Sequence, residues 1–387
     1  MSSINTNNDI EMLEQMKKHA AIGNYSQAKN IAEYLFQKNS EDIAIKFNLA
    51  IIYFYLGEYE KTKILFESQR NDCDFNGDFN KKERYIGALF YTRSSYLHEV
   101  ITKYLSDKDL PEDFSKALSF YKCCSYIMED SYTFFIETLQ LNNNLFSNKS
   151  HSSAINWAVT FHHLFNALAK FYLENPEYYE TIPGSKIMYV IGESHALPIA
   201  NLSIKFNDES YKIKSEVITG MKIWHLISET QNNSIAQFLF QLSRVPDGSK
   251  LIITCGEIDA RIDEGIIEYY YKNKDIDIWQ HVSQMTSRYA EFLYNNIVQQ
   301  RNFDLFVQGI PAPLNGAIVL SHDQERQLLH KQIIKYFNNQ LHAACNKYNM
   351  KFLDVYSITV DEHDSSNKKY HIDNYHLRPD YIYQILK

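Results

Sequence analysis

The chain has 387 residues, of which 45% are hydrophobic and 22% charged, and its formal net charge is −8 at pH 7. This length exceeds one comfortable hydrophobic core, so we expect two folded domains rather than a disordered chain. The acidic balance, without a block of lysine or arginine, excludes a nucleic-acid partner, which needs a concentrated basic patch. No apolar run approaches the roughly 18 residues of a transmembrane helix, so we expect no membrane span.

The amino terminus and the cysteines indicate the compartment. The start, MSSINTNNDIEMLEQ, lacks the basic and apolar regions of a secretory signal. The cysteines are odd in number and scattered without a CxxC pair, which argues against a disulfide framework and against a zinc site. We therefore expect a cytoplasmic protein without a cofactor or a bound metal. The cysteines are Cys73, Cys123, Cys124, Cys255 and Cys345.

Residues 1–180 are expected to form an all-helical domain, because apolar positions recur there at spacings of three and four. The motif GNYSQA begins at Gly23, and the similar GEYEKT begins at Gly57, 34 residues later. This period resembles that of tetratricopeptide repeats, which stack helical hairpins. The glycine lets the chain turn between antiparallel helices, and a small residue such as Ala28 permits their close approach.

A later stretch, PEDFSKALSFYKCC, repeats the aromatic-x-x-Ala spacing at Phe114 and Ala117. The early tryptophan and the terminal proline of tetratricopeptide repeats are missing, so a plain helical bundle remains the alternative. The resemblance implies a concave face that binds a protein partner.

Residues 181–387 are expected to form an α/β domain. Short apolar runs alternate there with helical patterns at 232–244, 278–300 and 322–348, which is typical of a parallel sheet covered on both faces. Chemistry in such sheets lies at the carboxyl ends of the strands. That rule places Ser194, Gly220, Gly256 and the turn at 309–313 along one edge. The expected strands are KIMYVIG (186–192), KSEVITG (214–220), KLIITCG (250–256), FDLFVQGIP (303–311) and KFLDVYS (351–357).

The stretch YVIGESHALP puts Ser194 directly after the first of these strands. A serine becomes a nucleophile when a histidine removes its proton and a carboxylate orients that histidine. Near the carboxyl terminus, Asp373 and His376 are three residues apart, a spacing that puts both side chains on one side of a helical turn or tight loop. We therefore predict a catalytic set of Ser194, Asp373 and His376, with an ordinary surface turn at 373–376 as the alternative.

Residues 185–387 resemble the SGNH (GDSL-type) hydrolases. IGESH looks like the first conserved block of that family, with Ser194 as nucleophile, and Gly220 looks like the glycine of the second block. CGEIDAR (255–261) occupies the third block, and DNYH (373–376) matches the final acid and base. The resemblance implies a three-layer α/β/α sandwich with a five-stranded parallel sheet, and ester hydrolysis through an acyl-serine. The backbone N–H groups of Ser194 and Gly220 would then form the oxyanion hole.

The third block departs from the family pattern, because Ile258 stands where an asparagine side chain donates to the oxyanion. Loss of one such donor typically costs about 100- to 1000-fold in rate. Arg261, Glu257, Asp259 or His195 could line the pocket or replace the donor, and the acids with Arg261 could instead form a structural ion-pair cluster.

The sequence thus predicts a serine esterase, such as an O-deacetylase acting on a glycan or similar small-molecule ester, with helical repeats that dock a protein. An O-acyltransferase of the same fold and a non-catalytic glycan- or protein-binding scaffold remain alternatives.

Overall fold

The computed structural model of the chain describes residues 7–68, 79–106, 110–146, 156–230 and 232–386. Backbone proximity divides the chain into two compact units, which we call the helical unit and the sheet unit. The helical unit takes in Met1–Ser125, Glu137–Thr160 and Gln231–Phe240, and the sheet unit takes in Tyr126–Ile136, Phe161–Thr230 and Gln241–Lys387. Each unit therefore contains residues from both sides of residue 180. The sequence predicts a single boundary between residues 180 and 181, and that boundary stays a prediction.

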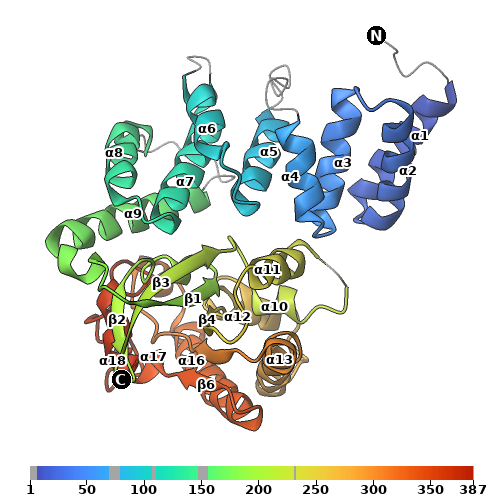
Figure 1. The fold of residues 1–387 in the computed structure, drawn as a ribbon. Helices are drawn as coiled ribbons and strands as arrows, with labels where there is room; N and C mark the ends of the chain where they lie inside the picture. The colour runs from blue at the N-terminus through green and yellow to red at the C-terminus, as the bar shows by residue number, and fades with distance from the viewer. Residues whose placement is uncertain (1–6, 69–78, 107–109, 147–155, 231, 387) are drawn as a thin grey trace. The chain divides into compact units, whose positions relative to one another are not determined.

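The helical unit begins with helices that follow one another along the chain (Figure 1). Alanine at two consecutive turns of the second helix gives it a fully buried face, where Ala28 and Ala32 pack with Met16, Leu49 and Ile52. Small side chains let the helix axes approach closely, as the repeat motif predicted for Ala28. The helices are α1 (Asn7–Ala21), α2 (Tyr25–Lys38), α3 (Ile43–Tyr55), α4 (Tyr59–Glu67), α5 (Phe79–Tyr91) and α6 (Leu97–Leu105).

The turns between paired helices have the same backbone geometry. Gly23 and Gly57 both have φ of +76°, and Arg93 has φ of +54°. At each turn this residue and the next donate N–H groups back to the preceding helix, as Gly23 does to Ala20 and Asn24 to His19. This is the Schellman motif, in which a left-handed residue ends a helix. Arg93, in the turn after α5, lies 36 residues after Gly57, close to the 34 residues between Gly23 and Gly57. This third turn has no glycine, so the sequence did not reveal it.

The same turn recurs at Asp130, with φ of +57°, after α7 (Glu112–Met128) and before α8 (Tyr132–Asn142). Phe114 therefore lies at the start of the helix that precedes a turn, whereas Tyr25 and Tyr59 begin helices that follow one. The aromatic-x-x-Ala match at Phe114 and Ala117 is thus out of phase with the first two copies. A further helix, α9 (Asn156–Glu174), continues from one unit into the other.

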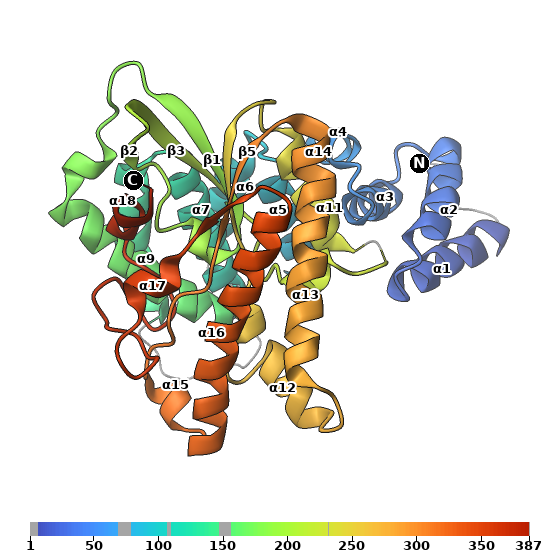
Figure 2. The ribbon, with the colours of Figure 1, turned by 90° about the horizontal axis from the view of Figure 1, so that it is seen from below.

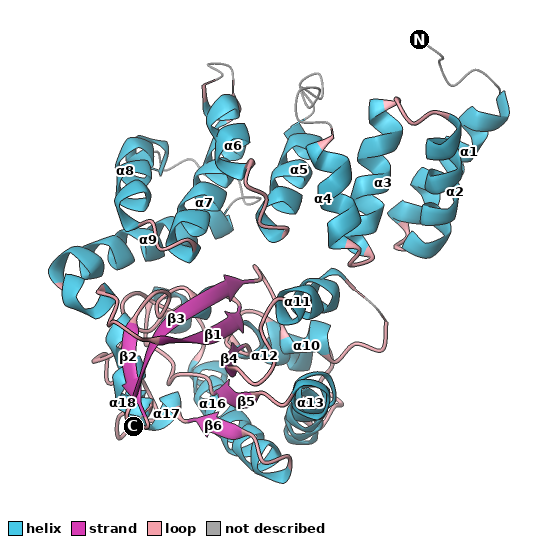
Figure 3. Ribbon diagram, viewed as in Figure 1, coloured by secondary structure: helices cyan, strands magenta, loops and turns pink. Residues whose placement is uncertain are grey.

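The sheet unit contains one sheet of six strands in the order β2-β3-β1-β4-β5-β6 (Figure 3). The fold is α/β, as predicted, but the sheet is not the expected five parallel strands alone, because β2 pairs antiparallel to β3 at one edge. Asn207 and Asp208, both with positive φ, turn the chain tightly between these two strands. The strands are β1 (Lys186–Gly192), β2 (Ser203–Phe206), β3 (Glu209–Val217), β4 (Lys250–Thr254), β5 (Asp304–Gln308) and β6 (Lys351–Leu353).

Besides β2, which was not predicted, several segments differ in detail from the sequence prediction: the strand expected at 214–220 is β3, which begins at Glu209 and ends at Val217. KFLDVYS is strand only as far as Leu353, because the Asp354 side chain accepts from the N–H of Ser357 and so starts the short helix α17 (Val355–Thr359). A helix at 265–272, α12 (Gly265–Lys272), was not predicted. The three expected helices are confirmed as α11 (Asn233–Ser243), α13 (Ile278–Leu293) and α16 (Gln324–Lys347), and α13 and α16 lie side by side (Figure 2).

The strand order positions the site. From β1 the chain runs to the edge strand β2, returns as β3 beside β1, and then crosses so that β4 pairs with the other side of β1. The carboxyl ends of β1 and β4 therefore form the switch point, where open α/β sheets bind ligands. These two strands approach so closely at Gly192 that a Cβ added there would lie 1.8 Å from Oγ1 of Thr254. Among the described residues, no helix is both long and apolar enough to cross a bilayer.

Candidate active site

Ser194 leaves the end of β1 on a single 3-10 turn, η5 (Ser194–Ala196). Glu193 has extended backbone, donates its N–H to the carbonyl of Thr254 on β4, and accepts the N–H of His195 on its side chain. The turn is thereby held against the neighbouring strand. Ser194 is 7% exposed, so its hydroxyl lies in a largely desolvated position at the switch point.

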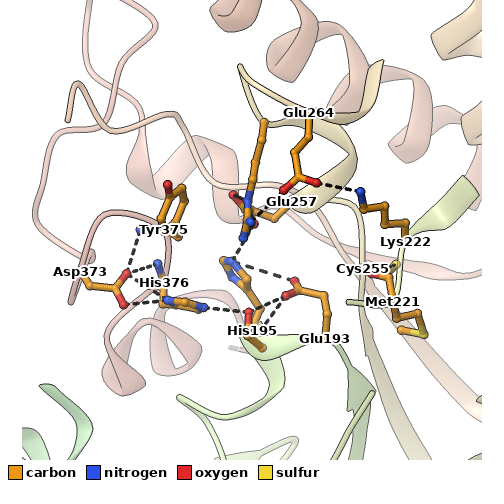
Figure 4. A network of polar contacts seen from close by, with 12 residues as sticks. Glu193, His195, Met221, Lys222, Cys255, Glu257, Glu264, Asp373, Tyr375 and His376 are labelled. Carbon is orange, nitrogen blue, oxygen red and sulfur yellow. Dashed lines mark hydrogen bonds and ion pairs between the residues drawn. The ribbon is translucent and has the colours of Figure 1, made fainter. Parts of the chain in front are cut away.

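Ser194, His376 and Asp373 are in hydrogen-bond contact (Figure 4). Oγ of Ser194 lies 2.8 Å from Nε2 of His376, and Nδ1 of His376 lies 2.8 Å from Oδ2 of Asp373. The carboxylate of Asp373 also accepts the N–H groups of Tyr375 and His376, which closes the 373–376 segment into a tight turn. The spacing of three therefore brings acid and base together through a loop, one of the two geometries that the sequence allowed.

The two ionisable groups of this set shift each other's pKa. Burial raises the pKa of Asp373, but the His376 ring and the two backbone N–H groups outweigh burial and hold that pKa well below its ordinary value. Burial lowers the pKa of His376, but the charge and hydrogen bond of Asp373, with smaller contributions from Glu193 and Glu257, raise it above the ordinary value. The site thus favours a charged imidazole beside a charged carboxylate.

Glu193 is a second acceptor for the serine hydroxyl and was not among the predicted site residues. Its Oε2 lies 2.7 Å from Oγ of Ser194, almost the same distance as Nε2 of His376. A serine hydroxyl carries one hydrogen, so it donates to only one of these acceptors at a time. The sequence did contain a signal for this contact, since a glutamate stands between the end of the strand and Ser194.

The two predicted oxyanion donors lie at the ends of adjacent strands. Gly220 follows β3 with φ of +66°, and no neighbouring atom would touch a Cβ placed on it. Among the hydrogen bonds of the described residues, the N–H groups of Ser194 and Gly220 donate to no protein acceptor. Both amides are therefore free to donate to a ligand.

Asp259 holds the segment that follows Gly220. Its carboxylate accepts the N–H of Ile223 at 2.8 Å and that of Trp224 at 3.2 Å. Burial raises the pKa of Asp259 to about 6, although these two N–H groups favour the charged form. Asp259 therefore faces the backbone rather than joining an ion-pair cluster with Arg261, and its effect on the site is positional.

Ile258, in the third block, is buried, and its side chain carries no hydrogen-bond donor. Arg261 donates from Nε and Nη2 to Glu257 and from Nη1 to Glu264. Burial opposes the charge of Glu257, but the Arg261 guanidinium outweighs burial and lowers the pKa of that carboxyl. Arg261 and Glu257 thus form the ion pair that the sequence offered as an alternative.

A cavity lies at the 371–375 loop, with an apolar wall from the turn after β5 and a polar wall from the third block and this loop; its lining residues do not include Ser194, Asp373 or His376. The guanidinium of Arg261 lies over the ring of Tyr375, 4.6 Å from its centroid. This arrangement suits a ligand with an apolar part and a polar part. Lining residues include Glu257, Arg261, Ile310, Pro313, His371 and Tyr375.

Two further sets of residues, the cysteines and a cluster of possible metal ligands, are of types that can take part in chemistry. Burial raises the pKa of the Cys255 and Cys345 thiols, the latter to about 12, which makes them poor nucleophiles; Cys73 lies outside the described residues. Glu193, His195 and Glu257 place three ligand atoms within 4.8 Å of one another, close enough to hold a metal ion.

Comparison of the sequence with protein-family models finds no match, and comparison with curated proteins finds none either.

Proposed function

We propose that the protein is a serine hydrolase of the SGNH type, which cleaves an ester through an acyl-serine intermediate. The observation that carries the proposal is the contact of Ser194 with His376, whose other ring nitrogen meets Asp373. The strand order, with the serine at the switch point of the sheet, supports an SGNH-like α/β/α sandwich in which β2 is an additional edge strand.

The chemistry follows from these contacts. Neutral His376 takes the proton of Ser194 as the oxygen attacks the ester carbonyl, and the resulting imidazolium is stabilised by Asp373. Collapse of the tetrahedral intermediate breaks the ester bond, and His376 returns the proton to the leaving alcohol. Water then attacks the acyl-serine with His376 again as base, which releases the acid and restores the hydroxyl.

The developing oxyanion would be met by the N–H groups of Ser194 and Gly220, which donate to no acceptor among the described hydrogen bonds. Ile258 adds no third donor. A two-donor site predicts a rate about 100- to 1000-fold below that of a site with the additional side-chain donor. That deficit favours a second function, the binding of an ester or glycan without cleavage.

The proposed substrate is a short-chain ester, such as an acetyl group on a glycan, because the cavity lined by Asn374 and Tyr375, from the loop that also carries Asp373 and His376, pairs an apolar wall with Arg261. Transfer of the acyl group to a sugar hydroxyl would use the same acyl-serine. The helical unit, with its recurrent Schellman turns, is proposed to dock a protein partner. The proposed compartment is the cytoplasm, in keeping with a chain whose thiols include the buried Cys255 and Cys345.

The test is labelling of the purified protein with a fluorophosphonate, together with hydrolysis of p-nitrophenyl acetate. We expect label on Ser194 and turnover that Ser194→Ala abolishes. Product analysis with an added sugar acceptor separates hydrolysis from transfer. Equal turnover in the wild type and Ser194→Ala would remove the proposal, and an unlabelled Ser194 in a folded protein would favour binding without cleavage.

A further inference from the structure

A triangle of possible metal-ligand atoms lies next to Ser194. It consists of Glu193 and His195, which flank the serine, and of Glu257 from the segment after β4 (Figure 4). Nε2 of His195 lies 4.0 Å from Oε1 of Glu193 and 3.8 Å from Oε2 of Glu257. All three residues come from the switch point, so the sheet itself brings them together.

His195 points an unsatisfied nitrogen into this triangle. The residue is 3% exposed, and its Nε2 has no hydrogen-bond partner. Leaving a buried nitrogen without a hydrogen-bond partner is unfavourable, and a bound ligand would provide that partner. In a neutral imidazole one ring nitrogen carries no hydrogen, so it can donate a lone pair to a metal ion.

The charges of the side chains around the triangle are also compatible with a bound cation. Arg261 compensates Glu257, and Lys222 pairs with Glu264 at 2.8 Å. The carboxylate of Glu193 is 1% exposed, and among the described residues no lysine or arginine lies within 4.0 Å of it. The hydroxyl and the N–H that it accepts are neutral, and the two cationic groups that interact with it, Arg261 and His376, are each paired with another carboxylate.

We propose that Glu193, His195 and Glu257 bind one divalent transition-metal ion beside Ser194. Two carboxylate oxygens and one imidazole suit Zn²⁺ or Mn²⁺ rather than Mg²⁺ or Ca²⁺, which prefer oxygen alone. Ligands at about 2.1 Å in tetrahedral geometry lie about 3.4 Å apart, so the two distances from His195 shorten by about 0.4–0.6 Å, and the three atoms, all within 4.8 Å of one another, need side-chain shifts of about 1 Å or less to close on the ion. A water molecule completes the coordination.

The ion would change which acceptor receives the serine proton. Oε1 of Glu193 faces the triangle, while Oε2 accepts the hydroxyl of Ser194. A cation on Oε1 withdraws charge from the carboxylate and weakens Oε2 as an acceptor, so the hydroxyl turns to His376. The binding site itself does not rest on the proposed hydrolase activity, because none of its ligands is Ser194, Asp373 or His376.

Isothermal titration of the full-length protein, stripped of metal with a chelator, tests the site directly. We expect one strong site for Zn²⁺ or Mn²⁺ and much weaker binding of Mg²⁺. Glu193→Gln, His195→Gln and Glu257→Gln should each weaken the strong site by at least about 100-fold, since even outer-sphere changes cost 10- to 100-fold. A zinc-soaked crystal should show an anomalous peak within the triangle.

Two controls separate this proposal from the proposed function. Ser194→Ala keeps all three ligands and should bind the ion with unchanged stoichiometry, whether or not the protein is an esterase. Glu264→Gln removes another carboxylate from the same Arg261 and should leave the strong site in place. Absence of a strong site in the wild type overturns the proposal, and so does a strong site that survives all three ligand substitutions in folded protein.

Discussion

Oγ of Ser194 and Nε2 of His376 lie 2.8 Å apart although 182 residues separate them in the chain. The first side chain is presented by the end of β1 and the second by the tight turn that Asp373 closes. Their contact ties the first strand of the sheet to the last loop of the chain, and most of the expected behaviour of the site follows from it.

Asp373→Asn should leave the fold intact and lower kcat for p-nitrophenyl acetate by about 10,000-fold, as loss of the carboxylate does in other serine triads. The amide cannot stabilise the imidazolium and favours the wrong ring tautomer. Asp361→Asn is the matched control, because Asp361 also accepts two loop N–H groups, those of His363 and Ser365, without a described contact to His376. Similar losses in both variants would show that loop geometry, not the acid, matters.

Glu193→Gln should shift the acidic limb of the kcat/KM profile to lower pH. The charge of Glu193 contributes to the raised pKa of His376, so its removal lowers that pKa, and the imidazole becomes neutral at a lower pH. The profile is measured with chelator present, so that a bound metal does not contribute. A limb that stays in place or moves to higher pH would contradict this assignment of the limb to His376.

The Asp373–His376 pair should stabilise the fold most at mildly acidic pH. The lowered pKa of Asp373 means that its contribution is present above the unfolded value of about 3.9 and is lost as the pH falls through the folded value. The raised pKa of His376 means that its contribution is complete below the unfolded value of about 6.5 and is lost as the pH rises through the folded value.

Urea unfolding of wild type and Asp373→Asn at pH 5 and pH 9 checks this window. The difference in unfolding free energy between the two proteins should be larger at pH 5, where both partners are charged. A difference that grows with pH would mean that His376 does not carry the charge in the folded state.

Gly192→Ala should destabilise the sheet unit by about 3 kcal/mol or more, which is at or above the top of the usual range for overpacked cores. The added Cβ would lie 1.8 Å from Oγ1 and 2.4 Å from the backbone oxygen of Thr254, and the backbone of a paired strand cannot move aside. Gly184→Ala is the control, since its φ of +80° strains alanine but nothing lies within 4 Å of the new atom. Thermal unfolding of both should rank Gly192→Ala well below Gly184→Ala.

Asp259→Ala should lower kcat more than it raises KM, because it releases the N–H groups of Ile223 and Trp224 and loosens the segment that carries Gly220. Asp259→Asn keeps one carbonyl acceptor and should recover part of the activity. Steady-state kinetics on a short ester check both. Equal losses in the two variants would point to the negative charge rather than to the position of the loop.

Much of the fold was visible in the sequence because local patterns determine it. The alternation of short apolar runs with helical periods predicted β1 and β4 almost to the residue, and the glycines at 23 and 57 marked two Schellman turns. The turns at Arg93 and Asp130 were missed because their left-handed residues are not glycine. β2 was missed because its pairing with β3 depends on an Asn-Asp turn inside a polar segment.

The residues proposed to be catalytic were selected from their order along the chain, but their environment could not be predicted in that way. Ser194, Asp373 and His376 are residue types whose chemistry can be read from sequence, and the i, i+3 spacing limits where Asp373 lies relative to His376. Glu193 beside Ser194, and Arg261 four residues after Glu257, are local pairs, whereas the approach of His195 to Glu257 and the contact of Ser194 with His376 depend on which segments the fold brings together. Sequence determines local conformation and chemical type, whereas the strand order of the sheet decides which distant groups share a desolvated space, and electrostatic interactions there depend on distances of a few ångströms.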